Sequence, residues 1–300
     1  MKRGKSLSFE KIIGNDKVKA FLNKQIEDNH VLHSYLFVGI DGIGKTLFAR
    51  EYARKILCLN KEENEDCISC IKWKSSNHPD FYEIEPENKT IKIEQIRQMQ
   101  EKIAEKPITS NRKVYLIIDS DTMTKEAQNC LLKTLEEPPE YTTIILTTAN
   151  ESKLLNTIKS RCMKISFETI ENQKIEEYLK SNLQIEPSKE LINLSEGSIG
   201  KAIMLEQEKE IYEQVNNVIN NIENQDLITT LNNAEVLYKE KEKIQEILEY
   251  INVFLYHTKE IKKLNCIQYV EETKKRLLAN GNYDMCIDYL LMNLWEKINN

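Results

Sequence analysis

Residues 35–46 read Tyr-Leu-Phe-Val-Gly-Ile-Asp-Gly-Ile-Gly-Lys-Thr, and this stretch decides the fold of the first half of the chain. Its last eight residues fit the phosphate-loop pattern G-x-x-x-x-G-K-[ST], between a short apolar run and a segment with helical periodicity. Glycines in such a loop allow positive φ values and close approach, so that successive backbone N–H groups can face one concavity and hold phosphate oxygens. The sequence therefore predicts a strand, an anion-binding loop and a helix, in that order.

The end of this loop indicates a bound nucleotide with Mg²⁺. Lys45 is expected to reach the β- and γ-phosphates, and Thr46 to place its hydroxyl group on the metal ion. The helix that begins near Gly44 adds its unpaired N–H groups and its dipole to the same positive field. The residues predicted to bind the nucleotide in this loop are Gly39, Asp41, Gly42, Ile43, Gly44, Lys45 and Thr46.

The composition is that of a soluble, helix-rich protein. The 300 residues suffice for two domains, with three allowed, and only eight glycines and six prolines interrupt them. The net charge of −6 argues against a protein that holds nucleic acid through its overall field, although a basic patch on one face is compatible with it. No apolar run approaches the ~18 residues of a membrane span, and no signal-peptide core is present, so we expect a cytoplasmic protein.

Apolar runs with strand character alternate with amphipathic helical segments through residue 167. These runs are 35–38, 80–84, 114–119 and 142–147. Such alternation is typical of a doubly wound parallel sheet, an α/β fold that binds ligands at the carboxyl ends of its strands. Asp119 ends one of these strands, so the fold predicts that its carboxylate lies at the binding edge.

After residue 167 the pattern indicates helices alone. Short helical segments are broken by Pro187, Gly197 and Gly200, and from Met204 onward only Gly281 interrupts the helical periodicity. We therefore expect a nucleotide-binding domain with a cysteine-bearing insertion, then a small helical domain, then an all-helical domain. Their predicted ranges are 1–167 with the insertion at 58–78, 168–206, and 207–300.

Four stretches resemble the clamp-loader branch of the AAA+ ATPases, which includes subunits of bacterial DNA polymerase III. They are His-Ser-Tyr-Leu-Phe-Val-Gly at 33–39, the strand 113–119, Ala-Gln-Asn-Cys-Leu-Leu-Lys-Thr-Leu-Glu-Glu-Pro-Pro at 127–139, and Thr-Ile-Lys-Ser-Arg-Cys at 157–162. The resemblance covers residues 7–205. It implies an AAA+ P-loop domain and a helical lid domain, and the helical periodicity of the remainder is consistent with the all-helical C-terminal collar domain of this family.

The resemblance also implies roles for single residues. Arg161 matches the arginine finger that projects into the ATP site of a neighbouring subunit, where its planar charge stabilises the charge developing on the phosphoryl group. The alternative is a surface arginine beside a buried cysteine. Asp119 is implied to support Mg²⁺, and Thr148, with Thr147 and Asn150 as alternatives, to sense the γ-phosphate. Threonines selected for β propensity are the simpler explanation of that stretch.

Two departures from the family pattern bear on hydrolysis. Active members follow the aspartate with a glutamate that positions the attacking water, whereas this chain has Ser120, and Asp121 is the candidate substitute. Active members also place an arginine on the γ-phosphate where this chain has Gly200, with Lys201 next to it. The resemblance with these departures implies a subunit that binds ATP with Mg²⁺ and hydrolyses it weakly or not at all.

Such a subunit would be a stator that supplies Arg161 to a neighbour. Its implied partners are gamma/tau-like and delta-like subunits in a pentamer and, through the assembly, the sliding clamp and primer-template DNA. One alternative is a competent motor ATPase of the gamma/tau type. A second is a small-molecule phosphotransferase, which would need an acceptor pocket and a basic lid that we do not find in the sequence.

Seven cysteines, an odd number, indicate reduced thiols or metal ligands rather than a disulfide framework. Cys58, Cys67 and Cys70 have the spacing at which the family carries four cysteines around a structural zinc ion, but Trp73 stands where the fourth is expected. The three thiolates are the candidate zinc ligands. His78 or water could supply the fourth position, or the site could have lost its metal.

Overall fold

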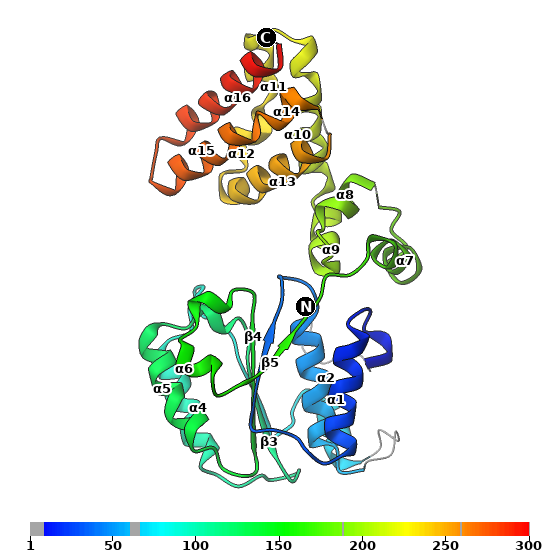
Figure 1. The fold of residues 1–300 in the computed structure, drawn as a ribbon, viewed down its shortest axis with the longest axis vertical. Coiled ribbons are helices and arrows are strands. Elements are labelled where there is room, and N and C mark those ends of the chain that lie inside the picture. The colour runs from blue at the N-terminus through cyan, green and yellow to red at the C-terminus, as the bar shows by residue number, and fades with distance from the viewer. Residues whose placement is uncertain (1–8, 61–66, 188, 259, 300) are drawn as a thin grey trace. The chain divides into compact units, whose positions relative to one another are not determined.

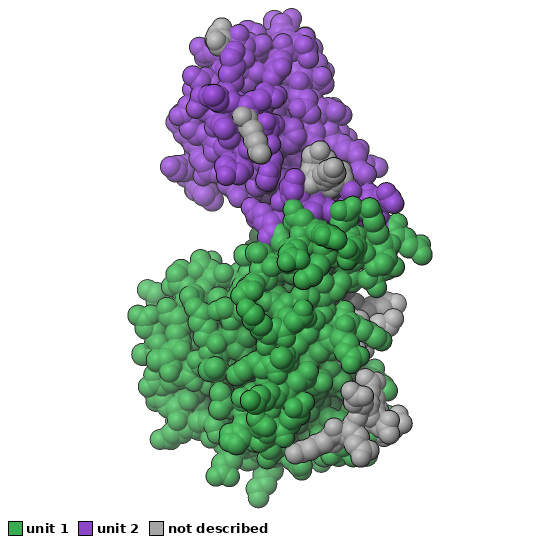
Figure 2. Space-filling model, turned by 45° about the vertical axis from the view of Figure 1, so that its right-hand side comes forward, with its two compact units in different colours: residues 1–184, 197–201 green, residues 185–196, 202–300 purple. Residues whose placement is uncertain are grey.

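The structure is a computed structural model that describes residues 9–60, 67–187, 189–258 and 260–299 (Figure 1). The chain forms two compact units (Figure 2). Unit 1 comprises residues 1–184 and 197–201, and unit 2 comprises residues 185–196 and 202–300. None of the described helices combines the length and the apolar character that crossing a lipid bilayer requires. The division into three domains stays a prediction.

Unit 1 is built on a five-stranded parallel sheet with the strand order β2-β3-β4-β1-β5. The strands are β1 (Ser34–Val38), β2 (Phe81–Ile84), β3 (Lys113–Ile117), β4 (Thr142–Thr148) and β5 (Met163–Ser166). Every residue of β3 and β4 is buried, so the two strands show apolar runs at 114–117 and 144–146 and no polar alternation. The doubly wound α/β fold predicted from the sequence is confirmed.

Helices cover both faces of the sheet (Figure 1). One face carries α1 (Asp16–Glu27) and α2 (Lys45–Leu57), and the other carries α4 (Ile93–Ile103), α5 (Lys125–Glu136) and α6 (Asn156–Lys159). The second face contains a continuous apolar core between helices and sheet. It includes Leu36, Ile96, Met99, Tyr115, Ile117, Leu131, Leu135, Ile144, Leu146 and Ile158.

The edge strand β5 is not among the strands that the sequence predicts. Only Ile165 of its four residues is buried, so the strand lacks the apolar run that marks the central strands. The sequence also predicts that one strand ends at Asp119, whereas β3 ends at Ile117. Asp119 instead has a left-handed backbone conformation, with φ of +49°.

Further helices and turns complete the described part of unit 1. They are α3 (Ile68–Lys74), α7 (Asn172–Leu183) and the 3₁₀ turns Phe9–Lys11, Ser120–Thr122 and Glu151–Lys153. The described part of unit 2 is entirely helical, and α9 begins within unit 1. Its helices are α8 (Lys189–Leu194), α9 (Ile199–Gln207), α10 (Lys209–Asn221), α11 (Leu227–Asn233), α12 (Glu235–Lys239), α13 (Ile244–His257), α14 (Ile261–Leu264), α15 (Ile267–Leu278) and α16 (Tyr283–Asn299), with the 3₁₀ turns Ile222–Asn224 and Lys241–Lys243. They enclose an apolar core of their own.

Candidate functional site

The phosphate loop joins the end of β1 to the start of α2, as the sequence predicts. Gly42 (φ +71°) and Gly44 (φ +102°) have left-handed backbone conformations that residues with a side chain rarely adopt. The ammonium group of Lys45 donates hydrogen bonds to the carbonyl oxygens of Gly39 (2.7 Å) and Ile40 (2.9 Å). The lysine side chain therefore lies along the inside of the loop.

Polar groups from the ends of β3 and β4 lie near this loop. The Asp119 N–H donates to Oγ1 of Thr147 (3.1 Å), and the Thr148 hydroxyl donates to Oδ1 of Asp121 (2.8 Å). Asn150, the third sensor candidate, uses its side-chain oxygen to cap the short turn that follows β4. Of the three candidates, Thr148 thus has a hydroxyl group directly on a carboxylate. Its role as a sensor stays a prediction.

Three carboxylates, of Asp41, Asp119 and Asp121, lie close enough to Lys45 to affect its pKa. Burial raises the pKa of Asp119 and the nearby Asp41 raises it further, while Lys45 acts in the opposite sense. Burial lowers the pKa of Lys45, against the effect of the carboxylates of Asp41, Asp119 and Asp121. These carboxylates repel one another, and a divalent cation would relieve the repulsion. The oxygen donors fit Mg²⁺, which Asp119 and the Thr46 hydroxyl could hold.

Ser120 is turned away from this group. It is fully buried, and its hydroxyl donates to the carbonyl oxygen of Thr147 (2.9 Å). A hydroxyl in that position cannot replace the carboxylate that would activate a water molecule. Asp121 is the next carboxylate along the chain, and it already accepts a hydrogen bond from Thr148.

Gly200 contacts the phosphate loop through its backbone. Its N–H donates to the carbonyl oxygen of Gly42 (3.0 Å), and the Ser198 hydroxyl donates to that of Asp41 (2.7 Å). A Cβ atom at position 200 would lie 2.7 Å from Gly42 Cα and 2.9 Å from its carbonyl oxygen. No side chain fits there unless the loop or α9 moves, which is a physical reason for glycine where the family resemblance implies arginine.

Arg161 lies at the opposite end of β1 from the phosphate loop. Its carbonyl oxygen accepts a hydrogen bond (2.6 Å) from the hydroxyl of Ser34, the first residue of β1, whereas the loop follows Val38, the last residue. The five residues of the strand correspond to roughly 16 Å. The guanidinium donates to the carbonyl oxygen of Thr157 (3.0 Å) and forms an ion pair with Glu136 (2.7 Å). The structure therefore separates Arg161 from the other predicted site residues.

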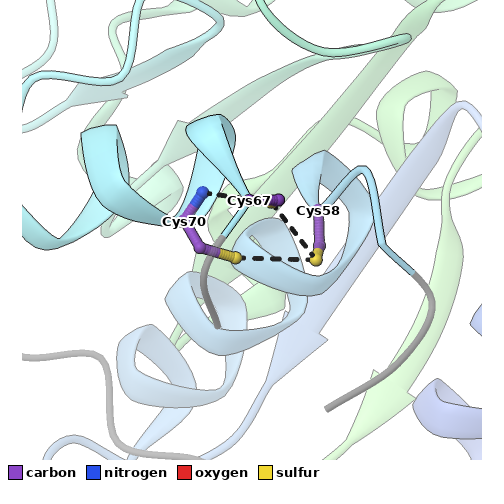
Figure 3. A group of neighbouring side chains, drawn as sticks. All are labelled: Cys58, Cys67 and Cys70. Carbon is purple, nitrogen blue, oxygen red and sulfur yellow. Dashed lines mark hydrogen bonds between the residues drawn. The ribbon is translucent and has the colours of Figure 1, made fainter. Parts of the chain in front are cut away.

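Cys58, Cys67 and Cys70 face one another between the end of α2 and the start of α3 (Figure 3). Their three Sγ atoms all lie within 4.8 Å of one another. Burial tends to raise the pKa of the Cys67 thiol, but hydrogen bonds from the backbone of Cys70, Leu59 and Asn60 and from the Cys70 thiol outweigh it and lower this pKa to about 6. The donor set fits three of the four positions of a tetrahedral zinc ion.

His78 does not complete this cluster. Its Nδ1 accepts a hydrogen bond from the Asp80 N–H (3.1 Å), and its Nε2 lies 2.8 Å from the Ser69 hydroxyl. Because Nδ1 is an acceptor, the proton is on Nε2, and neither nitrogen has a free lone pair for a metal. Trp73 packs against Phe81, with ring centroids 4.5 Å apart. Within the described residues, the group of close metal-ligating side chains consists of the three cysteines.

Comparison with known proteins identifies the family. Residues 14–171, more than half of the chain, match the family model described as DNA polymerase III, delta subunit. The chain belongs to this delta subunit family. A relative from Bacillus subtilis, DNA polymerase III subunit delta', is 34% identical over 206 residues, which are 68% of this chain and 62% of that protein. The tau/gamma subunit of Haemophilus influenzae is 34% identical over 175 residues, 57% of this chain and 25% of that protein.

The delta-family chain thus spans less than two thirds of the length of either relative. Among solved structures, a DNA polymerase III, gamma subunit-related protein from Thermotoga maritima has a TM-score of 0.52 at 19% identity. The alignment covers 93% of this chain and 99% of that one. The two chains therefore share a fold, the AAA+ P-loop fold that the sequence motifs imply.

Two residues of this delta-family site are not identified from the sequence. Glu136 partners Arg161 from 25 positions away, and Ser198 binds the phosphate loop from 157 positions away. Ser198 has a local signal, because serine is a preferred residue just before a helix. Its hydroxyl oxygen accepts a hydrogen bond from the N–H of Lys201, as in a helix N-cap. That signal predicts the cap but not the contact with Asp41.

Asp119→Asn is expected to raise the midpoint of thermal unfolding of the ligand-free chain at pH 7 by about 1–3 °C. The folded chain raises the pKa of Asp119, so its ionised carboxylate destabilises the folded state above that pKa, and the amide removes this effect. Asparagine also tolerates the left-handed backbone. The gain should shrink as the pH falls toward 3.8, the ordinary pKa. The exposed Asp28→Asn is the control, and a pH-independent loss of stability in Asp119→Asn would contradict the account.

Gly200→Ala is expected to destabilise unit 1 by about 1–2 kcal/mol, because the methyl group would collide with the Gly42 backbone. The sign is diagnostic, since glycine to alanine within a helix usually stabilises a protein by about 0.5–1 kcal/mol. Urea unfolding followed by circular dichroism measures the change. A stabilised variant would show that α9 does not press on the loop.

Proposed function

We propose that this chain is a delta-prime-like subunit of the bacterial DNA polymerase III clamp loader. In this proposal it is a stator that supplies Arg161 as an arginine finger to the ATP site of a neighbouring subunit while the sliding clamp is loaded during DNA replication. The observation that carries the proposal is the placement of Arg161 beside the first residue of β1, whereas the phosphate loop follows the last. From there the guanidinium is too far from the chain's own phosphate loop to serve its nucleotide, and this supports a role at the nucleotide of a second molecule.

The chain's own site supports the stator role over that of a motor. ATP with Mg²⁺ would be held by the phosphate-loop N–H groups, Lys45, Thr46, Asp119 and Thr148. Ser120 is buried and bonded to a carbonyl oxygen, so it offers no base for water activation. The contact of Gly200 with the loop leaves no space for an arginine on the γ-phosphate. We therefore propose that this subunit binds ATP with Mg²⁺ and hydrolyses it weakly or not at all.

The proposed partners follow from the family. They are gamma/tau-like and delta-like subunits in a pentamer and, through that assembly, the clamp and primer-template DNA in the cytoplasm. Relatives named as delta' and tau/gamma subunits of DNA polymerase III support this assignment. In the same proposal residues 1–167 are the AAA+ domain, 168–206 the lid and 207–300 the collar.

A competent AAA+ motor of the gamma/tau type is the second candidate. One observation favours it: the delta' and tau/gamma relatives have the same 34% identity to this chain. If Asp121 activated water in place of the missing glutamate, the chain would hydrolyse its own ATP. The burial of Ser120 and the glycine at 200 speak against it.

We also propose that Cys58, Cys67 and Cys70 hold a structural zinc ion whose fourth ligand comes from solvent. The support is the convergence of three Sγ atoms and the exclusion of His78 by its hydrogen bonds. A metal held by three thiolates would tie the end of α2 to α3 and stabilise the insertion.

The stator proposal is tested by ATPase assays on the reconstituted clamp loader with clamp and primed DNA. Arg161→Ala is expected to lower turnover by at least about tenfold, since a finger supplied in trans can contribute roughly 10³ to 10⁵ at its site. Lys45→Ala should stay within about twofold of the native assembly, and Lys159→Ala, on the same turn as Arg161, is the charge-matched control. If Lys45→Ala is the damaging change and Arg161→Ala is silent, the chain is a motor and not a stator.

The zinc proposal is tested by Trp73→Cys, which places a thiol three residues after Cys70 on α3. We expect zinc affinity, measured by competition with a chromophoric chelator, to rise at least about tenfold over that of Trp73→Ser. Both variants remove the same packing against Phe81, so their difference reports the fourth ligand alone. A native chain that binds no zinc in the same competition assay would mean that the three cysteines do not form a metal site.

A further inference from the structure

Two stretches that are distant in sequence, and the turn that precedes it, contact Arg161. The Ser34 hydroxyl binds its carbonyl oxygen, the Thr157 carbonyl oxygen accepts from one guanidinium nitrogen, and the Glu136 carboxylate pairs with another at 2.7 Å. Cys162, the next residue, is buried and fixes the backbone on the other side. The backbone and the side chain of Arg161 are thus restrained separately.

Glu136 is itself held at a defined position. It is the last residue of α5, and Pro138 and Pro139 prevent the helix from continuing. Leu131 and Leu135 on the same helix are buried in the core of unit 1. The carboxylate therefore comes from a rigid helix end and not from a loose loop.

Stability does not explain the pairing of Glu136 with Arg161. A carboxylate in the last turn of a helix opposes the helix dipole, which favours cations there. The two side chains are 49% and 34% exposed, and an ion pair this exposed contributes only about 0–1 kcal/mol. The stability of the fold therefore does not account for the ion pair between Glu136 and Arg161.

The contacts leave part of the guanidinium free. Arginine has five N–H donors in a planar fork. In the part of the chain that the structure describes, Arg161 contacts Thr157 through one terminal nitrogen and Glu136 through the other, and its side chain is 34% exposed. A guanidinium held on one side in this way can still present N–H groups to a phosphate.

We propose that Glu136 is a positioning residue for Arg161. Its carboxylate holds the guanidinium in one outward orientation, so that the side chain does not have to be ordered when the neighbouring nucleotide approaches. This inference rests on the proposed function, because it requires Arg161 to act in trans. It concerns the single contact with Glu136 and predicts that the contact assists the finger and does not compete with the phosphate.

The test compares Glu136→Ala, Glu136→Gln and Arg161→Ala in the reconstituted clamp loader with clamp and primed DNA. Glu136→Ala is expected to lower kcat for ATP about three- to tenfold, the size expected for ordering one long side chain, with KM for ATP unchanged. Glu136→Gln keeps an oxygen that can accept the hydrogen bond, so its kcat should lie between that of the native assembly and that of Glu136→Ala. Glu137→Ala, which removes the adjacent exposed carboxylate, is the matched control and should retain native turnover.

A double variant separates positioning from a general structural effect. In the Arg161→Ala background, Glu136→Ala should cause no further loss, because the group it positions is gone. An equal loss in both backgrounds would mean that Glu136 acts by another route. Faster turnover in Glu136→Ala would mean that the carboxylate competes with the phosphate for Arg161. Native turnover in Glu136→Ala would mean that the carboxylate does not position the finger. Either result overturns the inference.

The same assay distinguishes this inference from the function on which it rests. If Arg161→Ala lowers turnover and Glu136→Ala does not, the finger stands and only the positioning role fails. If Arg161→Ala is silent, the stator proposal fails and the role of Glu136 fails with it. Unfolding midpoints of the single variants within about 2 °C of the native chain would show that lost turnover is not lost folding.

Discussion

The parallel pairing of β1 with β4 on one side and β5 on the other is the constraint on which the site depends. In register, Val38 lies beside Thr148 of β4 and Ser166 of β5. The pairing continues past the strand, because the Gly39 N–H donates to the Thr148 carbonyl oxygen (3.2 Å) and the Phe167 N–H to that of Val38 (2.7 Å). These backbone bonds place the first residue of the phosphate loop beside the predicted sensor.

The other end of the same strand holds Arg161. The Ser34 hydroxyl binds the backbone carbonyl oxygen of Arg161, and β5 begins two residues after Arg161. A short, fully paired strand is a stiff element, so the phosphate loop and Arg161 keep a nearly constant separation. In the proposed stator, one end of the sheet binds the chain's own nucleotide and the other end serves the nucleotide of a neighbouring subunit. This geometry is what the proposed stator needs.

Much of the α/β fold can be predicted from the sequence because its signals are local. The apolar runs of β1, β3 and β4 reflect burial on both faces, and the glycine loop reflects backbone conformations that side chains disfavour. The edge strand β5 has no such signal, since a single buried residue produces no pattern. His78 shows the converse: its spacing from the cysteines suggests a ligand, but its hydrogen bonds to Ser69 and Asp80 commit both ring nitrogens.

The sequence by itself determined the phosphate loop, the alternation of strands and helices, the family motifs and the two departures at Ser120 and Gly200. These features are predictable because each depends on a short run of consecutive residues. Only the tertiary structure decided that Gly200 presses on Gly42, that Glu136 holds Arg161, and that Arg161 lies away from the chain's own phosphate loop. These are contacts between residues far apart in the chain, and the sheet order and helix packing that create them leave no trace in either partner's local sequence.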